Sequence, residues 1–444
     1  MNIGVVGTGY VGLVTGTMLA SRGNQVICVD SDQGVVRKLN QGEVHFFEPG
    51  LENEVRSASE KGLLTFTSDL REGVVGSETI FVCVGTPSNP DGSFNMDYVR
   101  KVSSEIGEIL RGVSCGEKTV VMRSTVEQGT HREISDIINS KIGKKERIWN
   151  YVSNPETLSE GTAVANFSKP DRIIIGSDSH LAIDRLKQIY HPFVRRTDKF
   201  EIGSPADAEL AKLMSNASLA MRVASVNEFA RIADVTLGAD MDTIRRMISS
   251  DARIGYQFLF PGAGYGGSCF PKDVPALVSR ARKDGYDPIL LGRVHESNEA
   301  HKVYMGDRIS TLLEQKIRPT IAVLGLTFKP DTDDMRDSPS VPIVTGLINR
   351  GAKVVAYEPM DKKARKIFGD NIKFGDGAYE VANGADALVL LTEWSEFDSV
   401  DFKHLNEVMK GNDIFDLRNR WRPQDANRHG FNYYGVGRSY PFKK

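Results

Sequence analysis

The sequence predicts an α/β fold class with two Rossmann-like, doubly wound parallel-sheet domains, joined by a central helical domain that contains one long helix. Three observations support this prediction. Short apolar stretches alternate with helical stretches in the first 203 residues, and the same alternation returns after residue 315. Between these regions, residues 206–233 lack proline and glycine and carry apolar side chains at helical spacing. We therefore expect three domains, residues 1–203, 204–315 and 316–444.

The first α/β region contains five short apolar stretches that are typical of buried strands. They are Asn2–Val6, Gln25–Val29 and residues 79–84, 119–122 and 171–175. Helical stretches separate the first four, as expected for parallel strands joined by crossover helices. In such a sheet the carboxyl ends of the strands meet at one edge, and ligands bind in the crevice there.

The central region is predicted to be mainly helical. Residues 206–233 would form a helix of about 28 residues, roughly 40 Å long at about 1.5 Å per residue. The helical pattern continues to about residue 313, interrupted by a glycine-rich loop at residues 261–271. A second α/β region follows, with strands expected at Thr320–Leu324 and at residues 352–357 and 385–391. We expect the two α/β regions to share an architecture.

Composition argues against several classes of function. Lys and Arg number 56 and Asp and Glu number 58, so the net charge of -2 gives no electrostatic reason to expect binding to nucleic acid or to a membrane surface. No apolar run approaches the ~20 residues of a membrane span, and no basic leader precedes the first strand, so we expect a cytoplasmic protein. Cys28, Cys83, Cys115 and Cys269 lack CxxC or zinc-like spacing, so neither a metal site nor a disulfide framework is predicted.

A dinucleotide-binding motif follows the first strand. Gly7-Thr8-Gly9-Tyr10-Val11-Gly12 is a GxGxxG sequence between a strand and a helix, and Asp30 ends the next strand. The three glycines permit a tight turn, a close approach of backbone to pyrophosphate, and packing of helix on strand. The Asp30 carboxylate would accept ribose hydroxyls and repel a 2′-phosphate, which favours NAD over NADP. The alternative is a simple glycine-rich turn, and the complete strand, helix and acid context argues against it.

Two further strand ends fall at the ligand edge of the predicted sheet. Gly85-Thr86-Pro87 and Ser124-Thr125 each follow a buried strand, where residues of a doubly wound sheet face a bound ligand. Ordinary turn formation would explain either segment equally well. We keep Gly85, Thr86 and Thr125 as candidate cofactor residues.

The loop from Gly264 to Asp273 places the thiol of Cys269 among small residues and close to Lys272 and Asp273. Glycines would let a substrate approach the sulfur, and a nearby positive charge favours the reactive thiolate. In a dehydrogenase, such a thiol could capture an aldehyde as a thiohemiacetal, which a second oxidation converts to a thioester and water converts to an acid. The alternative is that Cys269 is a buried, inert residue in a glycine turn. Cys28 and Cys83 lie inside predicted strands and are expected to be inert core thiols.

The chain resembles the UDP-glucose/GDP-mannose dehydrogenase family over nearly its whole length. The family's motifs occur here in the family's order. They are residues 7–12, Val84-Gly85-Thr86-Pro87, Ser124-Thr125-Val126, Asn154-Pro155-Glu156, Glu160-Gly161, Pro170-Asp171-Arg172, Glu209-Leu210-Ala211-Lys212, residues 266–273 and Gly325-Leu326-Thr327-Phe328-Lys329. The cysteine motif, with Phe258-Leu259 ahead of it, is most similar to that of members that oxidise UDP-glucose. The resemblance implies an NAD-dependent, four-electron oxidation of UDP-glucose to UDP-glucuronate.

The resemblance also implies roles for individual residues. Cys269 would be the nucleophile, with Lys212 and Asn216 as donors that stabilise negative oxygen, four residues apart on one face of the long helix. Asp273 and Thr125 would surround a catalytic water, and Glu156 would transfer a proton or order that water. From the helical pattern alone, a solvated helix lysine is the favoured interpretation of Lys212, and the family position reverses this. The alternative for Glu156 is a carboxylate at a helix N-terminus, and for Asp273 a helix cap.

Further residues are implied to bind the substrate, NAD or a second subunit. The implied substrate-binding residues, besides Glu156, Lys212 and Asn216, are Glu160, Arg253, Phe258, Leu259, Phe260, Pro261, Gly262, Gly266 and Lys329. Lys329 would neutralise the diphosphate, and Arg253 would reach the sugar site from the neighbouring subunit of a homodimer. Lys272 and Arg336 would lie near the cofactor. The three domains would bind NAD, carry catalysis and dimerisation, and bind the nucleotide sugar, in chain order.

The sequence departs from the family pattern at three positions. Thr157 and Ser218 stand where relatives commonly have a larger aromatic residue, and Val35 stands where they often have a lysine. The first two differences leave GDP-mannose and N-acetylated UDP-hexosamines as rival substrates. A rival of another class is a non-catalytic, NAD-binding regulator. The intact set of Lys212, Asn216, Cys269 and Asp273 argues against that rival.

Overall fold

The structure is a computed structural model and describes residues 1–112, 116–143, 149–194 and 199–438. Cys115 therefore lies outside the described residues. The chain forms two compact units, Met1–Ser215, called unit 1 below, and Asn216–Lys444, called unit 2. Among the described helices, none combines the length and the apolar character that a membrane crossing requires.

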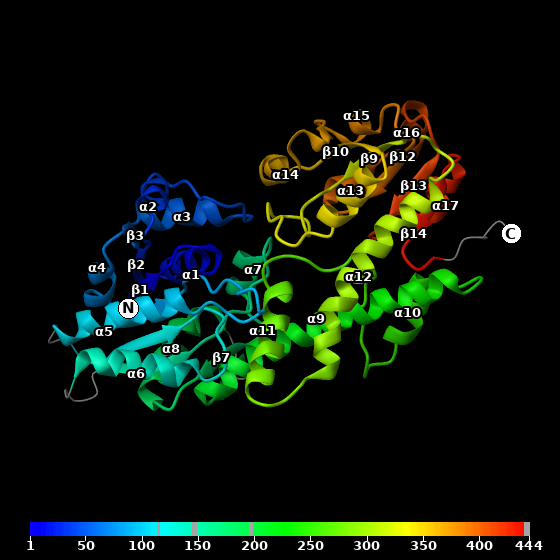
Figure 1. Ribbon diagram of the computed structural model, residues 1–444. Coiled ribbons are helices and arrows are strands. Elements are labelled where there is room, and N and C mark those ends of the chain that lie inside the picture. Colours follow the sequence, from blue (N-terminus) through cyan, green and yellow to red (C-terminus); the bar gives the residue numbers. More distant parts are fainter. Residues whose placement is uncertain (113–115, 144–148, 195–198, 439–444) are drawn as a thin grey trace. The chain divides into compact units, whose positions relative to one another are not determined.

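Unit 1 is built on an eight-stranded sheet with the strand order β3-β2-β1-β4-β5-β6-β7-β8. Figure 1 labels β1, β2, β3 and β7 of this sheet. Its strands are β1 (Asn2–Val6), β2 (Gln25–Val29), β3 (Leu64–Thr67), β4 (Thr79–Val82), β5 (Lys118–Met122), β6 (Trp149–Ser153), β7 (Ile173–Gly176) and β8 (Phe200–Gly203). Neighbouring strands are parallel except β6 and β7, which pair antiparallel. The predicted strand at residues 79–84 ends earlier, at Val82, and the one at residues 171–175 starts later, at Ile173.

The helices of unit 1 cover both faces of this sheet. They are α1 (Tyr10–Ala20), α2 (Gln33–Asn40), α3 (Leu51–Glu60), α4 (Leu70–Val75), α5 (Asp97–Arg111), α6 (Thr130–Ile142), α7 (Ala163–Ser168), α8 (His180–Tyr190) and the 3-10 helix η1 (His191–Phe193). Strand order reverses between β1 and β4, so right-handed crossovers place α1 and α5 on opposite faces. Fully buried Ile3 and Val5 of β1 belong to one core cluster with Leu13 of α1 and Leu51 of α3. The reversal creates the crevice in which doubly wound proteins bind ligands.

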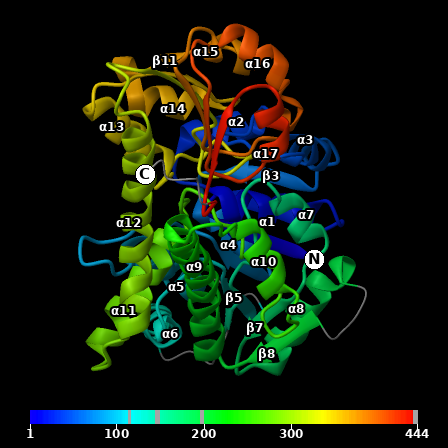
Figure 2. The same cartoon turned by 90° about the vertical axis from the view of Figure 1, so that its right-hand side faces the viewer.

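Helix α9 (Pro205–Val235) is 31 residues long and passes from unit 1 into unit 2. It confirms the single long helix expected from the proline- and glycine-free stretch. Unit 2 continues with α10 (Met241–Ser249), α11 (Phe270–Lys283) and α12 (Ile289–Leu312), and α11 packs against α12 (Figure 2). Buried Val226 and Ala230 of α9 join Met305 and Ile309 of α12 in the main core of unit 2.

Unit 2 contains a six-stranded parallel sheet with the order β11-β10-β9-β12-β13-β14. Its strands are β9 (Thr320–Leu324), β10 (Lys353–Tyr357), β11 (Lys373–Phe374), β12 (Ala387–Leu390), β13 (Asp413–Asp416) and β14 (Asn432–Gly435). Its helices are α13 (Ser340–Asn349), α14 (Asp361–Phe368), α15 (Ala378–Ala382), α16 (Phe402–Val408), α17 (Pro423–Arg428) and the 3-10 helices η3 (Gly369–Asn371) and η4 (Ser395–Ser399). This strand order repeats that of β3-β2-β1-β4-β5-β6 in unit 1, as expected for two halves of shared architecture.

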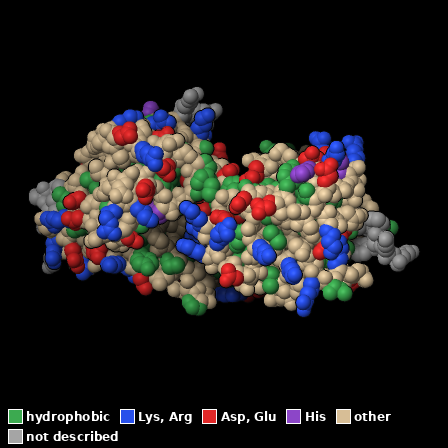
Figure 3. Space-filling view, turned by 90° about the horizontal axis from the view of Figure 1, so that it is seen from above, with side chains coloured by type: hydrophobic (Ala, Val, Ile, Leu, Met, Phe, Trp, Pro, Cys, Tyr) green, Lys and Arg blue, Asp and Glu red, His purple; other side chains and the backbone are tan. Residues whose placement is uncertain are grey.

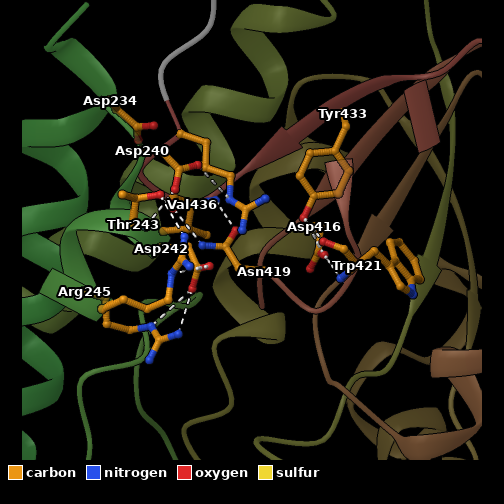
Figure 4. Close-up of polar contacts among 12 residues, drawn as sticks. Asp234, Asp240, Asp242, Thr243, Arg245, Asp416, Asn419, Trp421, Tyr433 and Val436 are labelled. Carbon is orange, nitrogen blue, oxygen red and sulfur yellow. Dashed lines mark hydrogen bonds and ion pairs between the residues drawn. The ribbon is translucent and has the colours of Figure 1, made fainter. Parts of the chain in front are cut away.

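Polar contacts tie the end of the second sheet to α10 within unit 2 (Figure 4). Asn419 brackets Val436 with two hydrogen bonds of 2.8 Å, from its Nδ2 to the Val436 carbonyl and from the Val436 N–H to its Oδ1. Asp240 caps α10 by accepting a hydrogen bond from the Thr243 N–H, and its carboxylate lies 3.6 Å from the Arg438 guanidinium. These contacts fix the chain after β14 against the start of α10.

Candidate active site

The glycine motif forms a tight turn between β1 and α1. Gly7 has φ +94°, and a side chain on Gly12 would lie 1.8 Å from the Gly7 carbonyl oxygen. Both positions therefore require glycine for conformation or space. Gly9 differs, because nothing lies within 4 Å of the position a side chain would take. An opening at the middle glycine is what a backbone that approaches pyrophosphate requires.

The N-terminus of α1 and Asp30 complete a site that fits NAD. Among the described residues, no side chain caps this end of α1, so the N–H groups of Tyr10 and Val11 can face an anion. Asp30 lies at the end of β2, where one carboxylate oxygen accepts hydrogen bonds from the Thr8 N–H at 2.8 Å and hydroxyl at 2.6 Å. Asp30 is only partly buried, which leaves lone pairs for ribose hydroxyls. Residues 7–12 and Asp30 therefore have the geometry of a dinucleotide site.

The two further strand ends lie together at the same edge of the sheet in unit 1. Thr86 donates a hydrogen bond from its hydroxyl to the Thr125 carbonyl at 2.7 Å. Ser124 donates one to the Val84 carbonyl at 2.7 Å. Gly85 is exposed, and its missing side chain would have no neighbour within 4 Å. The structure thus joins Thr86 to Thr125 and leaves the backbone of Gly85 open.

A buried carboxylate beside Tyr10 was not found by the sequence analysis. Glu48 is 5% exposed, and its carboxylate accepts hydrogen bonds from the Tyr10 hydroxyl, from the Gly161 N–H at 2.7 Å and from the Ala163 N–H at 2.7 Å. Burial, and then the hydrogen bond to Glu48, raise the pKa of Tyr10 well above its ordinary value. Glu48 thereby joins the start of α1 to the segment that contains Glu160. The charge of Glu160 also raises the pKa of Tyr10.

Glu156 and Lys212 form a buried ion pair in unit 1. The Lys212 Nζ lies 2.6 Å from the Glu156 Oε1, and the two side chains are 8% and 7% exposed. The other carboxylate oxygen accepts a hydrogen bond from the Leu158 N–H at 2.5 Å. Burial raises the pKa of Glu156, but the charge and hydrogen bond of Lys212, followed by the charge of Arg123, lower it below its ordinary value. Lys212 is therefore no solvated helix lysine, and Glu156 is held as a carboxylate.

Glu209, one turn before Lys212, has a structural role in unit 1. Its side chain is fully buried and accepts hydrogen bonds from the N–H groups of Gly129 and His131 at the start of α6, both at 2.8 Å. The Tyr151 hydroxyl donates another at 3.2 Å. These bonds fix the helix that presents Lys212.

Cys269 is the N-cap residue of α11 in unit 2 and is partly exposed. A sulfur at the N-terminus of a 14-residue helix lies near the positive end of the helix dipole, which favours the thiolate. Among the described cysteines, Cys28 and Cys83 are fully buried, and burial raises the pKa of Cys83 to about 12. Burial likewise raises the pKa of Cys28 well above its ordinary value. Cys269 is thus the described cysteine suited to nucleophilic chemistry.

Asp273 connects Cys269 to Asn216 and Lys272 within unit 2. Its backbone N–H donates a hydrogen bond to the Cys269 carbonyl at 2.7 Å. Its carboxylate, 1% exposed, accepts one from the Asn216 Nδ2 at 2.6 Å and lies 2.7 Å from the Lys272 Nζ. A cysteine, an acid, an amide and a cation are therefore brought together at one helix end.

Two glycines before Cys269, Gly266 and Gly267, are needed for close packing within unit 2. A side chain on Gly266 would lie 2.4 Å from the Asp337 carbonyl, and one on Gly267 would lie 2.7 Å from the Phe328 ring. These two glycines let the cysteine loop pack closely on the segment after β9. That the glycines of this loop also let a substrate approach the Cys269 sulfur stays a prediction.

Polar residues of long helices hold the loop at residues 258–266. The Gly262 N–H donates to the Asn227 Oδ1 at 2.9 Å, and the His301 Nε2 lies 2.7 Å from the Gly262 carbonyl. Asn298 brackets Tyr265 through its N–H and its carbonyl, at 2.8 and 3.1 Å. Burial, chiefly, lowers the pKa of His301 to about 4, so it is neutral and donates from Nε2. In the sequence, Asn227, Asn298 and His301 are visible only as polar residues on buried helix faces. Their spacing could not show which groups of the loop they bond.

The expected substrate-binding residues of unit 2 have varied environments. Phe258, with φ +60°, and Phe260 are exposed, while Leu259, Pro261, Gly262 and Gly266 are buried. The guanidinium carbon of Arg245 lies over the Phe260 ring, 4.4 Å from the ring centre.

The cations expected to contact ligands are placed as follows. Lys329 is partly exposed and lies beside the Phe328 ring. Arg418, which was not predicted from the sequence, donates a hydrogen bond to the Phe328 carbonyl at 3.3 Å. Arg336 pairs with Asp334, and Arg253, whose side chain is 89% exposed, pairs with Asp251. Acidic and basic side chains are interspersed on the face shown in Figure 3. Among the described residues, no group of His, Cys, Asp or Glu is arranged to hold a metal ion.

Comparison with known proteins assigns three segments to one family. Residues 1–194 match the NAD binding domain of the UDP-glucose/GDP-mannose dehydrogenase family. Residues 206–300 match that family's central domain, and residues 322–423 match its UDP binding domain. The NAD binding match covers the glycine motif and Asp30.

Two relatives and one solved structure are similar along the whole chain. UDP-glucose 6-dehydrogenase of Rhizobium meliloti is 40% identical over 443 residues, covering 99% of this chain and 100% of the relative. UDP-glucose 6-dehydrogenase of Pseudomonas aeruginosa is 38% identical over 447 residues, covering 99% and 98%. The structure of a UDP-glucose dehydrogenase from Pyrobaculum islandicum superposes with a TM-score of 0.89 at 31% identity and covers 98% of both chains.

Proposed function

The chain belongs to the UDP-glucose/GDP-mannose dehydrogenase family, and on that premise we propose that it oxidises UDP-glucose to UDP-glucuronate with NAD. The observation that carries the proposal is the placement of Cys269 at the N-terminus of α11, with Asp273, Asn216 and Lys272 beside it. A simple alcohol dehydrogenase needs no such thiol. An oxidation that continues from aldehyde to acid can use it, because the sulfur holds the carbon between the two oxidations.

The proposed reaction uses the cysteine as a temporary covalent link. NAD, when bound at the glycine motif, supplies the hydride acceptor for each of the two oxidations. Carbon 6 of the sugar loses a hydride and its hydroxyl loses a proton, which gives an aldehyde. The Cys269 thiolate then forms a C–S bond to that carbon, and protonation of the oxygen gives a thiohemiacetal. Loss of a second hydride and a proton gives a thioester. Water then adds, the C–S bond breaks, and the carboxylate and the thiol are released.

The remaining residues stabilise charge and move protons in this proposal. Lys212 and Asn216 donate to the oxygen that becomes negative, and one such donor contributes about 3 kcal/mol in a transition state. Glu156, held as a carboxylate, accepts a proton or orders the water. Asp273 and Thr125 position the water that cleaves the thioester.

In this proposal the substrate is bound by Glu160 and by residues of the central region and of the second α/β region. Residues 258–262 and Gly266 would line the nucleotide-sugar site, and the Lys329 ammonium would neutralise the diphosphate. Lys272 and Arg336 would contact NAD.

We also propose that the chain has three domains, residues 1–203, 204–315 and 316–444, and that two copies of the chain form a homodimer. Exposed apolar side chains on α9 support this proposal, because Phe229, Ile232 and Val235 are 46%, 58% and 75% exposed. Arg253, exposed in the single chain, would then complete the site of the neighbouring subunit. Dilution below the dimer dissociation constant should abolish activity, and fully active monomers would contradict the homodimer.

A panel of nucleotide sugars tests the function. We expect NADH release with UDP-glucose at about two equivalents per sugar, and UDP-glucuronate as the product. GDP-mannose and a UDP-N-acetylhexosamine serve as matched alternatives, because Thr157 and Ser218 replace aromatic residues that the family commonly has. A higher kcat/KM for either alternative would reassign the substrate, and no turnover with any of them would favour a non-catalytic NAD-binding protein.

A further inference from the structure

Arg123 is a buried cation that the mechanism above does not use. It follows β5 directly, is 5% exposed, and its backbone N–H donates to the Val82 carbonyl at 2.9 Å. None of the ion pairs found among the described residues includes Arg123, and its Nε is buried without a hydrogen-bond partner. A guanidinium buried in this way is costly unless its charge acts on a nearby group.

The side chain of Arg123 holds the two residues that precede Glu156. Its Nη1 lies 3.2 Å from the Asn154 carbonyl, 3.0 Å from the Asn154 Oδ1 and 3.3 Å from the Pro155 carbonyl. These two carbonyls belong to the last peptide units before Glu156. A single nitrogen thus fixes the direction in which the chain presents the Glu156 side chain.

Two aromatic rings and further hydrogen bonds hold Arg123 and Asn154 in place. The Arg123 guanidinium carbon lies 5.9 Å from the centre of the Phe167 ring and 6.0 Å from that of Tyr190, within the range of cation–π attraction. The Tyr190 hydroxyl donates to the Asn154 Oδ1 at 2.6 Å, and the Asn154 Nδ2 donates to the Ile174 carbonyl at 2.7 Å. Asn154 is therefore held from three sides.

Among the described residues, two cations, Lys212 and Arg123, lower the pKa of Glu156 through their charge. Lys212 on α9 pairs with it directly, and Arg123 after β5 acts over a longer distance. Besides these, the Leu158 N–H donates to the carboxylate. Two buried positive charges beside one carboxylate favour its ionised form, which is the form that a proton acceptor needs.

We propose that Arg123 is a positioning residue for Glu156: it holds the Asn154 and Pro155 carbonyls so that the carboxylate meets Lys212, and its charge keeps that carboxylate ionised during turnover. The inference rests on the proposed oxidation of UDP-glucose. A purely structural residue would instead affect only the stability of the chain.

The test compares two substitutions with a matched control in the full-length protein. Arg123→Met removes the charge and the donors, and Arg123→Lys keeps the charge but not the planar fork. The control is Lys118→Met at the other end of β5, where a lysine that is 6% exposed donates to the Val75 and Ser77 carbonyls at 3.0 and 2.5 Å. The readout is the pH profile of kcat with UDP-glucose and NAD, with thermal unfolding measured alongside.

We expect Arg123→Met to lower kcat by about tenfold or more, and to move the acid limb of the profile up by roughly one pH unit, because Glu156 becomes easier to protonate. Arg123→Lys should keep the limb and lose part of kcat, while Lys118→Met should keep both. If Arg123→Met keeps the native limb and only loses thermal stability like the control, the proposal is overturned. Should Arg123→Met fail to fold, native kcat in Arg123→Lys would also overturn it.

A second readout separates this inference from the proposed function. Infrared difference spectra of the carboxyl groups, assigned with Glu156→Gln, report the protonation of Glu156 without turnover. Arg123→Met should raise the pH at which the Glu156 signal changes, and an unchanged titration would contradict the inference. Absence of turnover in the wild-type chain would remove the proposed function alone.

Discussion

Replacing Lys212 with methionine should destabilise unit 1 in a way that depends on pH. The substitution leaves Glu156 as an unpaired carboxylate in a site where both partners are buried and the ion pair is 2.6 Å long. Breaking such a pair from one side costs about 3–5 kcal/mol, because the remaining charge loses its compensation. We expect a loss of this size near neutral pH.

The sign of the pH dependence follows from the Glu156 pKa. In the wild type, burial raises this pKa, but Lys212 and then Arg123 lower it below the ordinary value. A lowered folded-state pKa contributes stability that is present above the unfolded pKa and lost as pH falls through the folded pKa. Without Lys212, burial dominates and the folded pKa rises above the unfolded one, so stability is lost as pH rises. The difference between wild type and Lys212→Met should therefore be smallest below about pH 4 and grow toward pH 7.

The assay follows the unfolding of unit 1 separately. Trp149 is the tryptophan of unit 1, so replacing Trp394 and Trp421 with phenylalanine in all samples makes fluorescence report on that unit. Denaturant unfolding at several pH values gives the two free-energy curves. Lys141→Met, which breaks a surface pair with Glu108, is the matched control and should show no comparable pH dependence. A destabilisation by Lys212→Met that is equal at all pH values would refute the reasoning.

Three further substitutions test the site. Asp30→Ala should reduce the preference for NAD over NADP, measured as the ratio of the two kcat/KM values, and an unchanged ratio would place Asp30 away from the ribose. Cys269→Ser should stop net acid formation, because an oxygen ester replaces the thioester, and native rates of uronate release would exclude covalent catalysis. Gly12→Ala should abolish NAD binding in calorimetry, since its methyl group would lie 1.8 Å from the Gly7 carbonyl, and native affinity would contradict that packing.

Strand periodicity predicted the centre of each sheet better than its edges. The strands Asn2–Val6, Gln25–Val29 and Thr320–Leu324 were predicted at their observed bounds. The sequence analysis missed β6 and β8 for different reasons. Strand β6 is fully buried but contains Asn150, whose amide donates to Glu117 at 2.5 Å, so a polar residue interrupts the apolar run. Strand β8 is at the sheet edge with an exposed middle, and its composition resembles a loop.

Local motifs were predictable from sequence, whereas their supporting partners were not. The glycine turn and Asp30 depend on spacing within one βαβ unit, which a sequence displays directly. Glu48 supports Gly161 over 113 residues, and Asn298 supports Tyr265 over 33. A polar residue on a buried face is visible in the sequence, but the group it bonds is set by tertiary packing. Close packing of Gly267 on Phe328 is hidden for the same reason.

The two units use the same topology for different purposes, and the acidic residue after the second strand shows how. In unit 1, Asp30 is partly exposed, and the turn that it supports has an open glycine at Gly9. In unit 2, the corresponding residue after β10 is Glu358, which is 3% exposed and accepts hydrogen bonds from the Leu326 N–H at 2.5 Å and from the Thr327 N–H at 3.0 Å.

Burial raises the pKa of Glu358, although the hydrogen bonds that its carboxylate accepts from its own turn act in the opposite direction and lower it. Thr327 stands where unit 1 has Gly9, and it is 1% exposed. The backbone of that turn is therefore covered, and the Glu358 carboxylate uses its hydrogen bonds to hold the turn. Repetition of the strand order accordingly does not repeat the dinucleotide site, because that site depends on an uncovered glycine and a carboxylate with free lone pairs.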